Sequence, residues 1–305
     1  MEENKNETDL PSSFSLNREE NEFCCYKSIK STMIDALNSL EAKLKNSQNN
    51  NCLETGFPTL DFDNGNLIVL AARQGAGKTS FAFSLMKKLA ADKKVPVGYI
   101  NTGIVDNVTI GNKLLSIGSG VAFRKIRAGV LNMTDLKKIQ EKTGVLYDAP
   151  IYTAINPNCT FDEFVLFAEN MLKEKAVKLI IVDDFEYFGE LVDAEKDFCC
   201  YELETLMDKF KEFAVEHNIP IVLMMSLPPV EDYEVPGIKD FKKNLVIPYK
   251  ADMVLLLHRD RLEAECKDCD SLLITLKHVN HATWDIPLRF DPSTGYFSEK
   301  SDDSD

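Results

Sequence analysis

The sequence predicts an α/β protein: a mostly parallel sheet flanked by helices, followed by an antiparallel extension. From Thr55 onward, short apolar runs alternate with helical patterns, the element order of a parallel sheet covered on both faces. After Met253 the apolar runs follow one another with little helical sequence between them, which is typical of antiparallel strands. In addition, a glycine-rich loop separates one strand from the helix after it.

The composition is that of a globular protein. Of the 305 residues, 44% are hydrophobic and 28% charged. No stretch approaches about 18 apolar residues, and no basic segment leads into an apolar run, so we expect neither a membrane span nor a secretory signal. The expected location is therefore cytoplasmic, with the eight cysteines as free thiols. The formal net charge of −14 argues against broad electrostatic capture of nucleic acid but leaves contact through local loops open.

Four segments are expected along the chain. Residues 1–28 are a flexible acidic and polar tail, 29–53 a linker helix, 54–297 the α/β domain and 298–305 a second acidic tail. Apolar residues three or four apart give the linker helix one apolar stripe. That stripe either packs on its own domain or docks on a neighbouring subunit. Its members are Met33, Leu37, Leu40 and Leu44.

Within the α/β domain the periodicity places eight strands and five helices. The strands are expected at 67–71, 97–100, 151–153, 178–182, 219–225, 253–257, 272–276 and 286–290. The helices are expected at 78–91, 107–117, 133–144, 161–175 and 201–217.

The loop after the first of these strands has the pattern of a phosphate-binding loop. Glycines allow successive backbone N–H groups to turn inward toward phosphates, and the following helix adds the positive end of its dipole. Lys78 is expected to reach the β and γ phosphates of ATP, and Thr79 to ligate Mg²⁺. The full set of predicted nucleotide-binding residues is Ala72, Arg73, Gln74, Gly75, Ala76, Gly77, Lys78, Thr79 and Ser80.

The second signal is a carboxylate at the end of the strand predicted at 178–182. Asp183 stands at its carboxyl end, where a parallel sheet binds ligands, and is expected to hold the Mg²⁺ with Thr79. Asp184 comes directly after it and is a candidate catalytic base, with a solvated carboxylate as the alternative interpretation.

These motifs and their order resemble the motor domain of replicative DnaB-type helicases, which is RecA-like. The resemblance runs from TGFPTLD (55–61) through the phosphate loop, FRKIRAGVLNMTDLKKI (123–139), KLIIVDDFEYF (178–188) and ADMVLLLHRD (251–260) to IPLRFDPSTGYF (286–297). It implies ATP and Mg²⁺ as cofactors and single-stranded DNA as a partner. It also implies assembly, either into a homo-oligomeric ring, which is a hexamer by resemblance, or with other replication proteins. A RecA-type recombination or clock protein is a weaker alternative.

The chain departs from this family at three catalytic positions. Gly103 stands where the family has the glutamate that orients water, and Ser226 is followed by leucine rather than the γ-phosphate-sensing glutamine. Lys277 matches the family's lysine acting in trans on the neighbour's site, but Val279 replaces its arginine finger, a group worth about 10³–10⁵ in rate. His278 or Arg259 is a candidate replacement. We therefore expect weakened hydrolysis, or a catalytically inactive structural or regulatory relative.

Two lesser patterns remain. Cys266 and Cys269 form a CxxC that lacks a second pair nearby, so free thiols are favoured over a zinc site completed by histidines 258, 278 and 281. The segment 228–247 mixes acidic and basic residues and matches family loops that face DNA, with a solvated loop as the alternative.

Overall fold

The computed structural model describes residues 28–45, 52–192, 200–229, 234–259 and 269–300. By internal contacts the chain forms two units, Met1–Asn50 and Asn51–Asp305. The first contributes helix α1 (Ile29–Lys45). Its side chains Ile29, Met33, Ile34 and Leu37 are exposed. The side chains of Leu40 and Leu44, and residues 1–27 of the tail predicted at 1–28, lie outside the described part.

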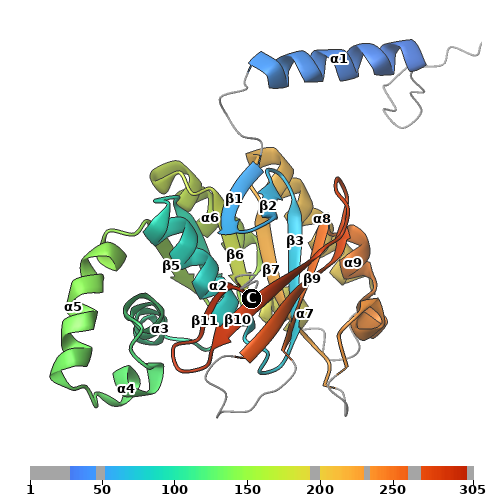
Figure 1. Cartoon of the computed structure of the whole chain (residues 1–305). Helices are drawn as coiled ribbons and strands as arrows, with labels where there is room; N and C mark the ends of the chain where they lie inside the picture. Colours follow the sequence, from blue (N-terminus) through green and yellow to red (C-terminus); the bar gives the residue numbers. More distant parts are fainter. Residues whose placement is uncertain (1–27, 46–51, 193–199, 230–233, 260–268, 301–305) are drawn as a thin grey trace, which may run out of the picture. The chain divides into compact units, whose positions relative to one another are not determined.

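The second unit contains a nine-stranded sheet and a separate two-stranded hairpin (Figure 1). The hairpin consists of β1 (Cys52–Phe57) and β2 (Leu60–Asp63). The large sheet comprises β3 (Leu67–Arg73), β4 (Val97–Asn101), β5 (Ile151–Ile155), β6 (Leu179–Asp183), β7 (Ile221–Leu227), β8 (Met253–Arg259), β9 (Cys269–His278), β10 (Asp285–Asp291) and β11 (Tyr296–Glu299).

The predicted fold class is confirmed. The strand order is β11-β10-β9-β8-β3-β7-β6-β4-β5, parallel from β8 to β5 and antiparallel from β8 to β11. All residues of β4 and β6 are buried, as expected for parallel strands covered on both faces. In β10, by contrast, buried and exposed residues alternate, because this antiparallel strand has one face in solvent.

Helices cover both faces of the sheet. The helical segments are α2 (Lys78–Met86), continued by a π-helical turn (Lys87–Asp92), α3 (Asn107–Ser119), α4 (Phe123–Ala128), α5 (Met133–Tyr147), α6 (Phe161–Lys175), η3 (Phe185–Tyr187), α7 (Gly189–Val192), α8 (Cys200–His217), η4 (Ile238–Asn244) and α9 (Val246–Lys250). Residues of α2 and α3 belong to one buried cluster, and those of α6 and α8 to another on the opposite face (Figure 1).

The second cluster contains a group of phenylalanines. Phe210 of α8 is fully buried, with ring centroids 5.1 Å from Phe161, 4.8 Å from Phe164, 5.9 Å from Phe185 and 5.2 Å from Phe188. Two of these rings directly follow β6. The cluster therefore fixes the segment that leaves β6 at the carboxyl edge of the sheet.

Some predicted boundaries differ from the structure. The hairpin β1–β2 and the short elements α4, η4, α9 and β11 were not predicted as elements, because each is too short to show a period. The strand predicted at 219–225 lies at Ile221–Leu227, since Ile219 still belongs to the turn after α8. Ser298 and Glu299, predicted as tail, form the end of β11.

Candidate nucleotide site

The phosphate-binding loop leaves β3 and enters α2 as predicted. Gly75 and Gly77 both have positive φ angles, 81° and 105°, which only glycine adopts without strain. A Cβ atom on Gly77 would also lie 3.0 Å from the ring of Phe297. Thr79 and Ser80 occupy the first turn of α2 and are half-buried. The loop therefore curves into the N-terminus of α2, an arrangement that binds anions in many proteins.

Lys78 is buried and spans the carboxyl ends of two neighbouring strands. Its ammonium donates to the Asp184 carboxylate, forming an ion pair, and to Ser226 Oγ at 3.0 Å. Asp184 follows β6, while Ser226 lies near the end of β7. The structure thus brings Lys78 together with two groups that lie more than a hundred residues away from it in the sequence.

Asp183 ends β6, beside Asn101 of β4. It is 2% exposed, and the Tyr99 hydroxyl donates to its Oδ2 at 2.6 Å. Burial, reinforced by the negative charge of Asp184, raises the pKa of Asp183 to about 7. Asn101, which pairs with Asp183 across β4 and β6, has a buried Oδ1 without a hydrogen-bond partner among the described residues. An unpaired buried oxygen beside a destabilised carboxylate fits the oxygen ligand set that Mg²⁺ or its water shell takes.

Glu186 is the functional candidate that the sequence interpretation missed. It lies in η3, and its carboxylate accepts a hydrogen bond from the Ser226 backbone N–H at 2.8 Å. Burial raises its pKa, against the opposing effect of the Lys78 charge. The spacing Asp183-x-x-Glu186 directly after a strand was the available signal.

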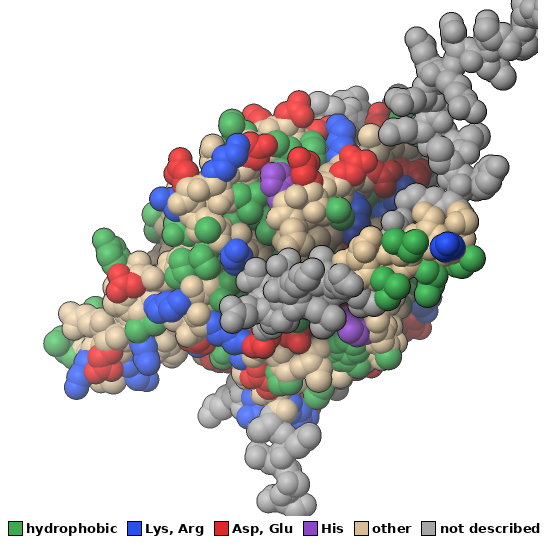
Figure 2. Space-filling model, turned by 90° about the horizontal axis from the view of Figure 1, so that it is seen from above, with side chains coloured by type: hydrophobic (Ala, Val, Ile, Leu, Met, Phe, Trp, Pro, Cys, Tyr) green, Lys and Arg blue, Asp and Glu red, His purple; other side chains and the backbone are tan. Residues whose placement is uncertain are grey.

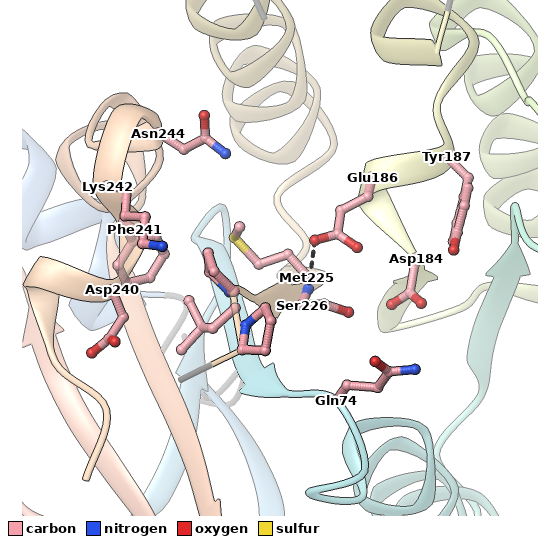
Figure 3. A pocket seen from close by; sticks show the side chains of 13 residues that line it. Gln74, Asp184, Glu186, Tyr187, Met225, Ser226, Asp240, Phe241, Lys242 and Asn244 are labelled. Carbon is pink, nitrogen blue, oxygen red and sulfur yellow. Dashed lines mark hydrogen bonds between the residues drawn. The ribbon is translucent and has the colours of Figure 1, made fainter. Parts of the chain in front are cut away.

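Asp184, Glu186 and Ser226 line one open cavity of about 750 Å³. In Figure 3, Gln74 extends from the phosphate loop at the lower right, and Asp184, Glu186 and Tyr187 lie above it on the same side of the cavity. The opposite wall comes from segment 228–247, through Asp240 and its neighbours. The cavity therefore joins the nucleotide site to the segment predicted to face DNA.

Arg73 connects the loop to that same segment. Its guanidinium donates to Asp240 Oδ1 at 3.1 Å and to the backbone oxygen of Glu234. Arg73 is thus a predicted nucleotide-binding residue whose charged group is directed toward 234–240. Residues 230–233 lie outside the described part of that segment.

The three departures from the family pattern have different surroundings. A Cβ atom on Gly103 would meet nothing nearer than 3.8 Å, so packing does not require glycine there. Leu227, which stands in place of the glutamine, is buried, and Ser226 before it contacts Lys78 and Glu186. Val279 is 58% exposed.

Lys277, predicted to act on a neighbouring site, lies on β9 beside the end of α9. Its ammonium donates to the backbone oxygens of Pro248, Tyr249 and Ala251 at 3.1, 2.8 and 2.6 Å. This arrangement satisfies carbonyls that a helix end leaves unpaired. Arg259, a candidate replacement for the finger, instead contacts the phosphate loop of the same chain. It donates to Gly75 O at 2.7 Å, and its guanidinium lies 4.4 Å from the Phe290 ring centre.

The zinc site considered around the CxxC falls partly outside the described residues, which exclude Cys266 and the side chain of Cys269. His258 pairs with Leu272, whereas His278 pairs with Met253 at the other end of the same strand pair. The structure therefore separates His258 from His278, and places His281 beside His278 instead.

Fold and site together define a P-loop nucleotide-binding domain of the RecA-like class. The chain belongs to the DnaB-like helicase C terminal domain family, whose model matches residues 52–299. It is 29% identical over 283 residues to the replicative DNA helicase DnaB of Treponema pallidum (strain Nichols), covering 90% of this chain and 62% of that protein. It is 25% identical over 265 residues to a probable plasmid replicative DNA helicase of Chlamydia muridarum, covering 83% and 56%. The chain thus spans less than two thirds of these relatives.

Solved structures agree on the fold. One of them, an isolated ATPase domain, superposes with a TM-score of 0.74 at 17% identity, covering 91% of this chain and all of that one. A DnaB-like replicative helicase, solved in a study of its interactions with primase, gives 0.72 at 18%, covering 88% and 66%. Among the described helices, none has the length and apolar character needed to cross a membrane.

Proposed function

We propose that this chain is the ATP- and Mg²⁺-binding motor domain of a DnaB-type replicative DNA helicase or translocase, with weakened hydrolysis. The observation that carries the proposal is the ion pair between Lys78, at the start of α2, and Asp184, which follows Asp183 at the carboxyl end of β6. It lies beside a loop whose two glycines have positive φ angles. Lys78 would bind the β and γ phosphates, while Thr79 and Asp183 would hold Mg²⁺. Bound Mg²⁺ would neutralise charge on the transferring phosphoryl group.

Weak hydrolysis follows from the groups present. Gly103 offers no base, and Asp184, the candidate base from the sequence, is engaged in an ion pair with Lys78. Glu186 is the better candidate base, because it faces the same cavity and its carboxylate is engaged by a backbone N–H, that of Ser226, rather than by a cation. A carboxylate can accept a proton from the attacking water either by a direct hydrogen bond or through one bridging water.

The alternative is a catalytically inactive, ATP-binding structural or regulatory relative of the helicase. The glycine in place of the catalytic glutamate and the exposed valine in place of the arginine finger favour it. Both functions share the fold and the ligand, so only turnover separates them.

Single-stranded DNA binding and assembly into a ring are part of the proposal. Acidic and basic side chains are mixed over the face in Figure 2, which favours DNA contact through a local segment such as 228–247 over a broad basic surface. In a ring, the apolar stripe on α1, which includes Met33 and Leu37, would dock on a neighbouring subunit; packing on the chain's own domain is the alternative.

The test is ATP hydrolysis by the purified chain, with and without single-stranded DNA, using Lys78→Ala as the blank. ATP turnover that exceeds the blank and rises when DNA is added supports the motor function. Nucleotide binding that requires Lys78 but gives no turnover supports the inactive relative. Equal nucleotide binding by wild type and Lys78→Ala contradicts both.

A further inference from the structure

Two histidines and one aspartate converge away from the nucleotide site. His278 ends β9, His281 lies in the following turn, and Asp63 ends β2 of the separate hairpin. One potential ligand atom from each lies within 4.8 Å of the others. The cluster therefore bridges two sheets that share no strand pairing among the described residues.

We propose that Asp63, His278 and His281 bind one transition-metal dication of the Zn²⁺ type. Imidazole nitrogen combined with a carboxylate oxygen suits Zn²⁺, Co²⁺ or Ni²⁺, whereas Mg²⁺ prefers oxygen ligands alone. Three protein ligands leave a position for water. The site is independent of the proposed ATPase function and does not rest on it.

The distances allow closure around a metal with small movements. His281 Nε2 lies 3.9 Å from Asp63 Oδ2, and the two imidazole ring centres are 4.6 Å apart. Tetrahedral Zn²⁺ with bonds of about 2.0–2.2 Å places its ligand atoms about 3.3 Å apart. The His281 side chain is 57% exposed, so its ring can rotate without disturbing packed neighbours.

Asn280 already holds the other two ligands in place. Its side-chain amide donates to Asp63 Oδ2 at 2.9 Å, and its backbone N–H donates to His278 Nδ1 at 3.2 Å. The indole of Trp284 packs 5.7 Å from the His278 ring centre. The bond to Nδ1 is long, and it keeps that nitrogen unprotonated, as a metal ligand must be. A metal ion bound at His278 Nδ1 would take the place of the Asn280 backbone hydrogen. The bond from the Asn280 side chain to Asp63 would remain and orient the carboxylate, as outer-shell partners of metal ligands do.

Binding would join the β1–β2 hairpin to the turn between β9 and β10. A metal bound only by the folded chain stabilises it, so the melting temperature should rise with metal concentration. Ordinary packing of the histidines predicts no such dependence.

The experiment uses the full chain without an affinity tag. Cys52→Ser removes the free thiol whose residue pairs with Asp63 across the hairpin, and Cys266→Ser and Cys269→Ser remove the CxxC. Excess Mg²⁺ and no nucleotide keep the added metal from the phosphate site. Titration with Co²⁺, followed by its visible absorption and by calorimetry, should give one equivalent per chain without thiolate-to-metal charge transfer. Zn²⁺ should compete and raise the melting temperature.

Matched variants give the decisive comparison. His281→Ala and Asp63→Asn should abolish saturable binding and the thermal shift, and Asn280→Ala should weaken binding by about 10- to 100-fold. Asp61→Asn, an exposed carboxylate on the same strand, and His217→Ala on α8 should bind like the parent. Absence of binding in the parent, or unchanged binding in His281→Ala and Asp63→Asn, overturns the proposal.

Discussion

Replacing Glu186 with glutamine tests the proposed water-activating group directly. Glutamine keeps the side-chain length and an oxygen that can accept the Ser226 N–H now bonded at 2.8 Å, but it cannot take a proton. A positioned general base contributes about 10²–10⁴ in rate, equal to about 3–5 kcal/mol of barrier. We expect single-turnover ATP hydrolysis to fall by that factor, with nucleotide affinity little changed.

Glu190 supplies the matched control. Its carboxylate also accepts a backbone N–H, that of Phe161 at 2.7 Å, but in α7 away from the phosphate loop. Both glutamine variants exchange a charged acceptor for a neutral one, at a stability cost of about 1 kcal/mol. Glu190→Gln should therefore retain hydrolysis. If Glu186→Gln hydrolyses ATP as fast as wild type while Asp184→Asn does not, the assignment of the base to Glu186 is wrong.

Three further outcomes are expected. Gly103→Glu should raise the hydrolysis rate, because it restores the carboxylate at a position where an added Cβ atom meets nothing nearer than 3.8 Å; a rate equal to wild type would show that the missing glutamate is not what limits turnover. Raising the pH through about 7 should strengthen Mg²⁺–nucleotide binding with release of a proton from Asp183, and calorimetry in two buffers of different ionisation enthalpy should find that release in wild type but not in Asp183→Asn. The folded chain holds this proton more tightly than the unfolded one, so the contribution of Asp183 to stability without metal declines as pH rises from about 4 to 7. Phe210→Ala should lower the free energy of unfolding by about 3–5 kcal/mol in urea titration, whereas Val215→Ala on the exposed side of the same helix should change it by about 0.5 kcal/mol or less.

The parallel sheet was predictable because its strands are short and continuously apolar. Residues 67–71 and 179–182 are apolar throughout, which favours burial on both faces; Lys178, at the start of the predicted strand, is exposed and precedes β6. The glycines between 72 and 79 suit the loop that the structure shows. The phosphate loop and Asp183 could likewise be recognised locally, since each lies within a few residues of its own strand.

The remaining site residues could not be found in this way, because their roles depend on neighbours distant in sequence. Glu186 becomes a candidate base only once β7 places the Ser226 amide beside it. Arg73 belongs to the phosphate loop by sequence, yet Asp240, 167 residues away, turns its guanidinium toward another segment. The pairing of Asp63 with the histidine turn also depends on the long-range docking of a hairpin too short to show a period.

The contacts around Lys78 form one network, which gives nucleotide binding a structural consequence. The ammonium bonds Asp184 and Ser226, and the Ser226 amide bonds Glu186, so a single chain of contacts connects the ends of β6 and β7 to the phosphate loop. A γ-phosphate that binds Lys78 competes with Asp184 for the same ammonium, because both are anions. Ser226 leads directly into segment 228–247, which Arg73 also contacts from the loop. Nucleotide binding should therefore change the contacts on both sides of the cavity, and that is the coupling a DNA-translocating motor requires.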